Sequence, residues 1–195
     1  PILEIILEQC INQGFNKFSI SVNYLKNQIK DYFKNGSKLN VYIDYLEEKF
    51  YSGTAGSLSL FKKKPIKPFI VINGDVLSKI NLKNLIDFHD KYNSDITLSI
   101  KKYYSEIPYG TVDLDGYKVN FFEEKPVIIK NVNAGIYMIN PTILKIIPKK
   151  RYIDMTELIN LAKRKKFKIN AFPIYEYWQD LGDYKNIIQT EKQWE

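Results

Sequence analysis

In the first half of the chain, segments with apolar residues at helical spacing are followed by segments in which apolar residues recur as they do in a strand, and the two kinds of segment succeed each other. Apolar residues at helical spacing within 2–13 predict a helix, and the alternating run Phe18–Val22 predicts a strand. The succession continues with helices expected at 25–33, 53–61 and 82–92, and strands at 39–45, 69–72 and 95–100. Strands and helices in this order are typical of an α/β protein. We expect a Rossmann-like mixed, mostly parallel sheet with helices on both faces.

The second half of the chain has a different pattern, with shorter strands predicted between turns. Turn signals at Asp115–Gly116 and Glu124–Pro126 separate shorter strands, expected at 110–114, 117–122 and 132–139. A short helix is expected to begin at Pro141, and a second helix, capped by Asp154, at 155–165. A strand at 168–173 and a last helix from Asp183 complete the series. No linker or repeat interrupts the pattern, so residues 1–195 are expected to form one domain.

Composition narrows the class of protein. The 195 residues are 45% hydrophobic and 26% charged, which is ordinary for a globular domain large enough to bury a core. No apolar run reaches the length of a membrane span, and we expect no membrane association. Cys10 is the single cysteine, which excludes an internal disulfide and a cysteine-rich metal site. We expect Cys10 to be buried and the protein to be cytoplasmic.

The formal charge of +7 comes almost entirely from lysine, because Arg151 and Arg164 are the only arginines. Proteins that read base edges in nucleic acid rely on the planar guanidinium of arginine, and that chemistry is nearly absent here. We therefore expect no nucleic-acid partner. A basic surface does attract small anionic substrates such as phosphates.

Several common catalytic motifs are missing. His89 is the only histidine, and no Gly-x-Ser-x-Gly turn accompanies it, which argues against a Ser-His-Asp hydrolase. The chain contains neither the G-x-x-x-x-G-K-[ST] phosphate loop nor G-x-G-x-x-G after a strand. A P-loop kinase and a Rossmann dehydrogenase are therefore unexpected.

Two aspartates, Asp75 and Asp180, are candidates for a metal-binding site. The apolar run Phe69–Ile72 reads as a buried strand, and it is followed by Asn73, Gly74 and Asp75. In open α/β sheets ligands bind at the carboxyl ends of the strands, which places Asp75 at such an edge. Asp180 follows Trp178 near the end of the chain, and Mg²⁺ is commonly held by one or two carboxylates together with phosphates and water. The alternative for Asp75 is a turn or helix-cap residue.

Other short motifs are compatible with phosphate or sugar binding, and each has an ordinary structural alternative. The loop Gly53–Gly56 could bring backbone N–H groups close to a base or phosphate, or simply begin a helix. Lys125 offers an ammonium to a phosphate, or is an exposed turn lysine. Asn133–Gly135 within a strand suggests either close approach of a ligand or a bulge.

Taken in order, these motifs resemble the sugar-phosphate nucleotidylyltransferases, the NDP-sugar pyrophosphorylases. The matching segments are Gly53–Gly56, Asn73–Asp75, Pro108–Val112, Glu123–Pro126, Asn133–Tyr137 and Trp178–Gly182. Within that family the chain is most similar to the mannose-1-phosphate guanylyltransferase-like branch, some members of which carry CBS domains upstream. The resemblance implies Mg²⁺-dependent formation of an NDP-sugar and pyrophosphate from an NTP and a sugar 1-phosphate, with GTP favoured over uridine or thymidine nucleotides.

The resemblance also implies roles for individual residues. Asp75 and Asp180 would hold Mg²⁺ and, with Lys125, form the catalytic set. Gly53, Thr54, Ala55 and Gly74 would bind the nucleotide. Gly110, Glu124, Lys125 and Asn133 would bind the sugar phosphate. A homo-oligomer is compatible with this family.

The chain departs from the family at its amino end. The family signature is a first strand followed by Gly-Gly-x-Gly-Thr-Arg, and neither is present before Pro1. We therefore expect these residues alone to be inactive and marginally stable, with the first strand of the sheet missing. Two other classes stay open: a non-catalytic nucleotidylyltransferase-like regulatory or binding domain, and a glycosyltransferase. The latter expects an Asp-x-Asp metal motif, and Asp113-x-Asp115 reads as turn chemistry.

Overall fold

The computed structural model describes residues 1–182, so the helix expected from Asp183 lies outside the described residues. The α-helices are α1 (Ile2–Asn12), α2 (Lys26–Phe33), α3 (Gly53–Gly56), α4 (Leu82–Lys91) and α5 (Met155–Arg164). Short 3₁₀ helices are η1 (Ser37–Leu39), η2 (Ser57–Leu60) and η3 (Pro141–Lys145). The helix expected at 53–61 is therefore two short pieces, α3 and η2.

Ten strands lie among the described residues. They are β1 (Lys17–Val22), β2 (Tyr42–Glu47), β3 (Phe69–Ile72), β4 (Val76–Ser78), β5 (Ile96–Glu106), β6 (Thr111–Asp115), β7 (Lys118–Glu123), β8 (Val127–Ile139), β9 (Ile169–Pro173) and β10 (Trp178–Asp180). Strands β3, β8, β5 and β9 form the main sheet in that order. Three further pairs, β1–β2, β4–β10 and β6–β7, form separate two-stranded sheets.

The strand directions confirm a mixed α/β fold but correct the expectation of a mostly parallel sheet. Only β1–β2 and β5–β9 are parallel among the described pairs. β8 pairs antiparallel with both β3 and β5, because the chain returns directly from β5 through a hairpin and enters the sheet beside β3. Strand β1 pairs with β2 and makes no pair with β3, so the β1–β2 pair is not joined to the main sheet. A strand before Pro1 that would join them stays a prediction.

Helices cover both faces of the main sheet, as the sequence predicts. Successive side chains of a strand point to opposite faces. In β8, Tyr137 and Ile139 therefore enter one core cluster, which includes Leu158 of α5, while Ile136 and Met138 enter another, which includes Leu85 of α4. The side chains on the two faces of this one strand thus contribute to both core clusters.

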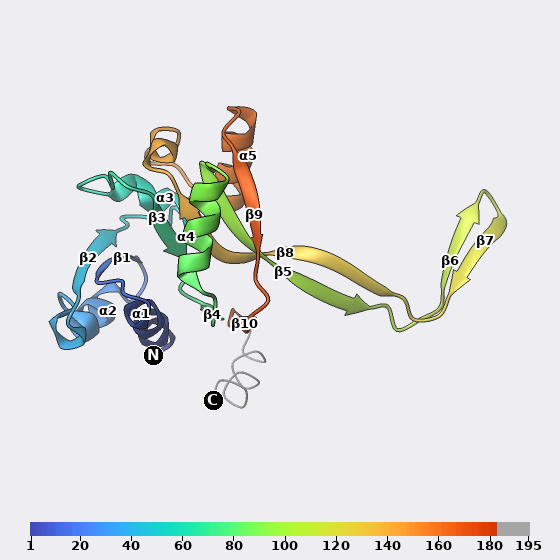
Figure 1. Ribbon diagram of the computed structural model, residues 1–195, viewed down its shortest axis with the longest axis horizontal. Coiled ribbons are helices and arrows are strands. Elements are labelled where there is room, and N and C mark those ends of the chain that lie inside the picture. Colours follow the sequence, from blue (N-terminus) through green and yellow to red (C-terminus); the bar gives the residue numbers. More distant parts are fainter. Residues whose placement is uncertain (183–195) are drawn as a thin grey trace.

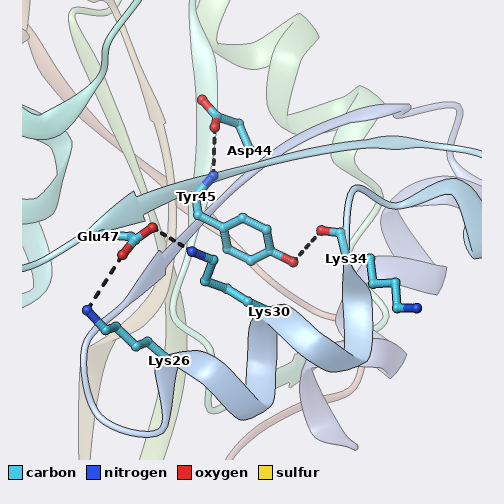
Figure 2. A network of polar contacts seen from close by, with 6 residues as sticks. All are labelled: Lys26, Lys30, Lys34, Asp44, Tyr45 and Glu47. Carbon is cyan, nitrogen blue, oxygen red and sulfur yellow. Dashed lines mark hydrogen bonds and ion pairs between the residues drawn. The ribbon is translucent and has the colours of Figure 1, made fainter.

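A polar network ties α2 to β2 at the surface (Figure 2). The Nζ atoms of Lys30 and Lys26 lie 2.6 and 3.6 Å from the Glu47 carboxylate. The hydroxyl of Tyr45 donates a 2.6 Å hydrogen bond to the carbonyl of Lys34. The hydrogen bond from Lys30 lowers the pKa of Glu47. Exposed ion pairs of this kind contribute little to stability, so the network orients the helix more than it stabilises it.

A long arm projects from the body of the molecule (Figure 1). We define the arm as residues 101–132, which comprise the outer halves of β5 and β8 and the hairpin β6–β7. The sequence predicts β5 to end at Ile100 and β8 to begin at Val132, whereas the two strands stay paired out to Glu106 and Val127. Residues 101–106 mix aromatic, charged and polar side chains without a clear alternation, so hydrophobic periodicity does not predict this part of the strand.

No helix within residues 1–182 combines the length and the apolar character needed to cross a membrane.

Candidate functional site

Asp75 and Asp180 are brought together by a strand pair that the sequence did not predict. The buried strand β3 ends at Ile72, and a turn through Asp75 leads into β4. β4 pairs antiparallel with β10, with Asp180 opposite Val76. The N–H of Leu181 donates a 2.8 Å hydrogen bond to the carbonyl of Asp75. Two residues far apart in the sequence thus become neighbours at the end of β3.

The two carboxylates border the same small space beside Gly182. The Gly182 N–H donates a 2.8 Å hydrogen bond to Oδ1 of Asp180. A Cβ added to Gly182 would lie 3.1 Å from this oxygen and 3.8 Å from Oδ2 of Asp75. A glycine here keeps the space between the carboxylates open.

This pair of oxygens suits a hard divalent cation. Mg²⁺ prefers oxygen ligands and usually takes one or two carboxylates, completing its shell with water and phosphate oxygens. No group of three or more histidine, cysteine, aspartate or glutamate side chains suited to a metal occurs in the part of the chain that the structure describes. Asp75 and Asp180 therefore fit Mg²⁺ shared with a phosphate better than a metal enclosed by protein ligands alone.

A bulge in β8 lies against the turn that carries Asp75. The pairing of β5 with β8 shifts between Leu98↔Tyr137 and Ile100↔Asn133. The Asn73 N–H donates a 2.9 Å hydrogen bond to the carbonyl of Gly135, whose φ is 70°. A Cβ on Gly135 would lie 2.9 Å from Nδ2 of Asn73. The bulge alternative for Asn133–Gly135 is confirmed, and its glycine lets Asn73 approach closely.

The side chain of Asn133 is held by its own strand. Its Nδ2 donates a 2.6 Å hydrogen bond to the hydroxyl of Tyr137, and its Oδ1 accepts one of 3.2 Å from the Gly135 N–H. Burial raises the pKa of Tyr137, so its phenol is neutral at physiological pH. These bonds shape the bulge, and a contact between Asn133 and a sugar stays a prediction.

Trp178 joins the bulge to the strand that carries Asp180. Its indole Nε1–H donates a 2.8 Å hydrogen bond to the carbonyl of Ala134. Trp178 and Asn73 belong to two of the sequence motifs, but no role is predicted for either side chain from the sequence. The signal available was their position, since Trp178 precedes Asp180 by one full strand repeat and Asn73 follows the buried strand directly.

The loop Gly53–Gly56 is built against the start of α5. Gly53 has a φ of 81°, and a Cβ on it would lie 2.5 Å from the carbonyl oxygen of Ile153. The Thr54 N–H donates to Oδ1 of Asp154 at 3.1 Å, and the Ala55 N–H donates to Ile153 O at 3.1 Å. Packing alone accounts for this glycine, and nucleotide binding by Gly53, Thr54 and Ala55 stays a prediction. Gly74 has open space around its Cα.

Asp154 stands at the N-cap position of α5, as predicted, but its side chain does not cap the helix. The hydroxyl of Tyr152 donates a 2.6 Å hydrogen bond to Oδ2 of Asp154, and this bond and the one from the Thr54 N–H lower the pKa of Asp154. The Met155 N–H instead donates to Oγ1 of Thr54 at 2.8 Å. Thr54 therefore caps α5 across a long sequence separation.

Gly110, Glu124 and Lys125 lie on the arm at the base of the β6–β7 hairpin. A Cβ on Gly110 would lie 2.9 Å from Oε2 of Glu124, so these two residues are close together. Lys125 has a φ of 48°, which is consistent with a tight turn. Figure 1 shows β6 and β7 well separated from β4 and β10. The structure therefore does not bring these three residues to Asp75 and Asp180.

Comparison with known proteins defines the class of this chain. Residues 1–195 match the family model described as Nucleotidyl transferase, and the chain belongs to this family.

Particular relatives narrow the similarity. The chain is 31% identical to the mannose-1-phosphate guanylyltransferase catalytic subunit beta of Drosophila pseudoobscura pseudoobscura, over 96% of this chain and 52% of that protein. It is 28% identical to mannose-1-phosphate guanylyltransferase 1 of Arabidopsis thaliana, over 90% and 51% respectively. The chain thus spans about half the length of these relatives, and its similarity confirms the guanylyltransferase-like resemblance.

A solved structure confirms the fold. HddC from Yersinia pseudotuberculosis, complexed with GMP-PN, superimposes with a TM-score of 0.73 at 24% identity, covering 100% of this chain and 86% of that chain.

Proposed function

We propose that the protein to which these residues belong is a sugar-1-phosphate nucleotidylyltransferase. A phosphate oxygen of the sugar 1-phosphate attacks the α-phosphorus of an NTP, the bond from that phosphorus to the β-phosphate oxygen breaks, and pyrophosphate leaves with the bonding electrons. The products are an NDP-sugar and pyrophosphate. The observation that carries the proposal is the convergence of Asp75 and Asp180 beside Gly182 in a chain of the nucleotidyl transferase family.

Guanine is the favoured base and mannose 1-phosphate the favoured sugar. The supporting observations are the names of the relatives and the GMP-PN bound to HddC. Positioning and charge neutralisation do most of the work in such transfers, so the reaction needs little proton chemistry from the protein.

The roles of individual residues follow from this reaction. Asp75 and Asp180 would hold Mg²⁺, which supplies positive charge to the phosphates when bound. Gly53, Thr54, Ala55 and Gly74 would lie along the nucleotide. Gly110, Glu124, Lys125 and Asn133 would contact the sugar phosphate, and this assignment rests on the motifs.

The experiment measures pyrophosphate release by the full-length protein across four NTPs and a panel of sugar 1-phosphates. We expect activity with GTP and mannose 1-phosphate. We expect Asp75→Asn and Asp180→Asn each to lower kcat/KM by at least 100-fold, or several kcal/mol, through loss of a metal carboxylate. Asp113→Asn on the arm is the matched control and should leave activity unchanged. Equal rates for all three variants would contradict the metal assignment.

A non-catalytic binding or regulatory domain is the second candidate. The arm, which carries Lys125 between β7 and β8, projects away from β4 and β10, and this favours the second candidate, because a catalytic site would need Lys125 close to Asp75 and Asp180 (Figure 1). The two functions differ in a direct measurement. A binding domain retains GDP-sugar, detected by calorimetry, and releases no pyrophosphate with any NTP.

A further inference from the structure

The chain crosses the main sheet just before it reaches Asp180. Strand β9 lies at one edge of the sheet, whereas β10 pairs with β4, which directly follows β3 at the opposite edge. Between Pro173 and Trp178 the chain therefore passes across β5 and β8 (Figure 1). We call residues 174–177 the crossing segment. It belongs to none of the described strands, so its backbone groups need partners other than a strand ladder.

Both ends of the crossing segment are fixed by hydrogen bonds to neighbouring strands. At its start, the Ile174 N–H donates a 2.8 Å hydrogen bond to the carbonyl of Ile100 in β5. At its end, the carbonyl of Tyr177 accepts hydrogen bonds from the Lys79 N–H at 2.9 Å and from the Ser78 hydroxyl at 3.1 Å. The two residues between these ends are held by a side chain.

The ammonium group of Lys101 holds the middle of the crossing segment. Its Nζ donates a 2.7 Å hydrogen bond to the carbonyl of Glu176 and one of 3.2 Å to the carbonyl of Tyr175. Hydrogen bonds from an ionised donor are roughly twice as strong as those between neutral groups. The partners are 74 and 75 positions apart in the sequence, so no local motif predicts the contact.

The crossing segment in turn controls where Asp180 lies. Asp180 follows Glu176 by four residues, and β10, which carries it, forms three residue pairs with β4. Because this pairing is so short, a displacement of the crossing segment is transmitted to β10. The carboxylate of Asp180 would then move away from the space that it shares with Asp75 beside Gly182.

We propose that Lys101 is a positioning residue for the metal site, because it holds the crossing segment and thereby keeps Asp180 close to Asp75. This role rests on the proposed function of the two aspartates as ligands of Mg²⁺. Lys101 contacts no reacting atom in this role. It acts through the carbonyls of Tyr175 and Glu176 and through β10.

The test compares Lys101→Met with Lys102→Met in the full-length protein. Methionine keeps an unbranched side chain and removes the ammonium group in both variants. Successive side chains of a strand point to opposite faces, so Lys102, which pairs with Asn131, lies on the other face of β5. The two variants therefore remove the same charge from adjacent positions, but only Lys101→Met removes the bonds to the crossing segment.

The first measurement is the binding of Mn²⁺ alone, used as a probe for Mg²⁺ and followed by electron paramagnetic resonance of the free ion. We expect Lys101→Met to raise the dissociation constant about tenfold, or about 1.4 kcal/mol. Lys102→Met should stay within about threefold of the wild type. Lys101→Arg should also stay within that range, because arginine keeps a cationic donor at this position.

The second measurement is amide hydrogen exchange, which reports on β10 independently of any metal. The Leu181 N–H, bonded to the carbonyl of Asp75, should exchange faster in Lys101→Met than in Lys102→Met. The Leu158 N–H in α5 should exchange equally in both, which shows that the fold as a whole is retained.

Three results would overturn the proposal while leaving the metal assignment intact. They are equal Mn²⁺ affinities for the two methionine variants, a loss of affinity that Lys101→Arg does not restore, and faster exchange at Leu181 with unchanged Mn²⁺ affinity. The last result would limit Lys101 to a structural role. A wild-type protein that binds no Mn²⁺ contradicts the metal assignment itself, and the positioning role of Lys101 fails with it.

Discussion

At the scale of single residues, His89 is a buried titratable group outside the candidate site. Its side chain is 2% exposed between α4 and β5, and its Nδ1 lies 2.8 Å from Oγ1 of Thr97. Burial lowers the pKa of His89 below its ordinary value of 6.5, although Asp90 and Asp95 act in the opposite direction. The imidazole is therefore neutral in the folded protein at neutral pH.

Acidification should destabilise the fold through His89. Below about pH 6.5 the unfolded chain binds a proton that the folded chain does not, so the free energy of unfolding falls by up to about 1.4 kcal/mol per pH unit until the lowered pKa is reached. His89→Asn retains a polar group at the Nδ1 position and cannot be protonated. Urea unfolding at about pH 7.5 and about pH 5.5 should show a smaller loss of stability for this variant. An equal loss would show that other groups cause the pH dependence.

At the scale of elements, β10 is the strand on which the candidate site depends. It is three residues long, pairs with β4, and carries Asp180. A strand this short has few hydrogen bonds of its own. The bond from Trp178 to the carbonyl of Ala134 therefore adds a second attachment, to the bulge of β8.

Replacing Trp178 by Phe keeps an aromatic ring and removes the donor. We expect a loss of about 1 kcal/mol in the free energy of unfolding, since the buried carbonyl loses its partner. We also expect weaker binding of Mn²⁺, used as a probe for Mg²⁺, because Asp180 is held less firmly. Thermal unfolding and metal titration measure the two effects, with the exposed Tyr175→Phe as the control. Unchanged Mn²⁺ affinity would limit Trp178 to a structural role.

At the scale of the whole molecule, α1 connects parts that share no strand pairing. Its residue Leu7 packs in the cluster of β1 and β2, and Cys10 packs in the cluster beneath α4. Ile6 packs with Leu77 and Leu181 next to the candidate site. The β1–β2 pair and the main sheet are separate sheets, and both α1 and Phe18 of β1 pack in the core clusters of the two.

Ile6→Ala should weaken that connection. Truncating a buried isoleucine destabilises a protein by about 2–5 kcal/mol through lost burial and the cavity left behind. We expect a lower urea midpoint, together with increased hydrogen exchange at Leu77 and Leu181. Ile66→Ala is the matched control, because Ile66 is 93% exposed and should change stability by little. A variant as stable as the control would contradict the role of α1.

The sequence predicted most elements of the body but not the contacts between them. The helices α1, α4 and α5 and the strands β1, β3 and β9 were expected close to where they lie, because each has a clear period and a boundary signal. Strands β4 and β10 were missed because three residues are too few to show a period. The outer halves of β5 and β8 were missed because their residues lack alternation.

The sequence by itself determined the α/β class and the family, and it predicted Asp75 and Asp180 as metal ligands, since periodicity and short motifs are local properties of the chain. Only the tertiary structure decided that Asp180 meets Asp75, that Asn133–Gly135 is a bulge, and that Lys125 stands apart on an arm. These features depend on hydrogen bonds between distant segments. Such bonds are set by the packing of the whole fold, and no local pattern records them.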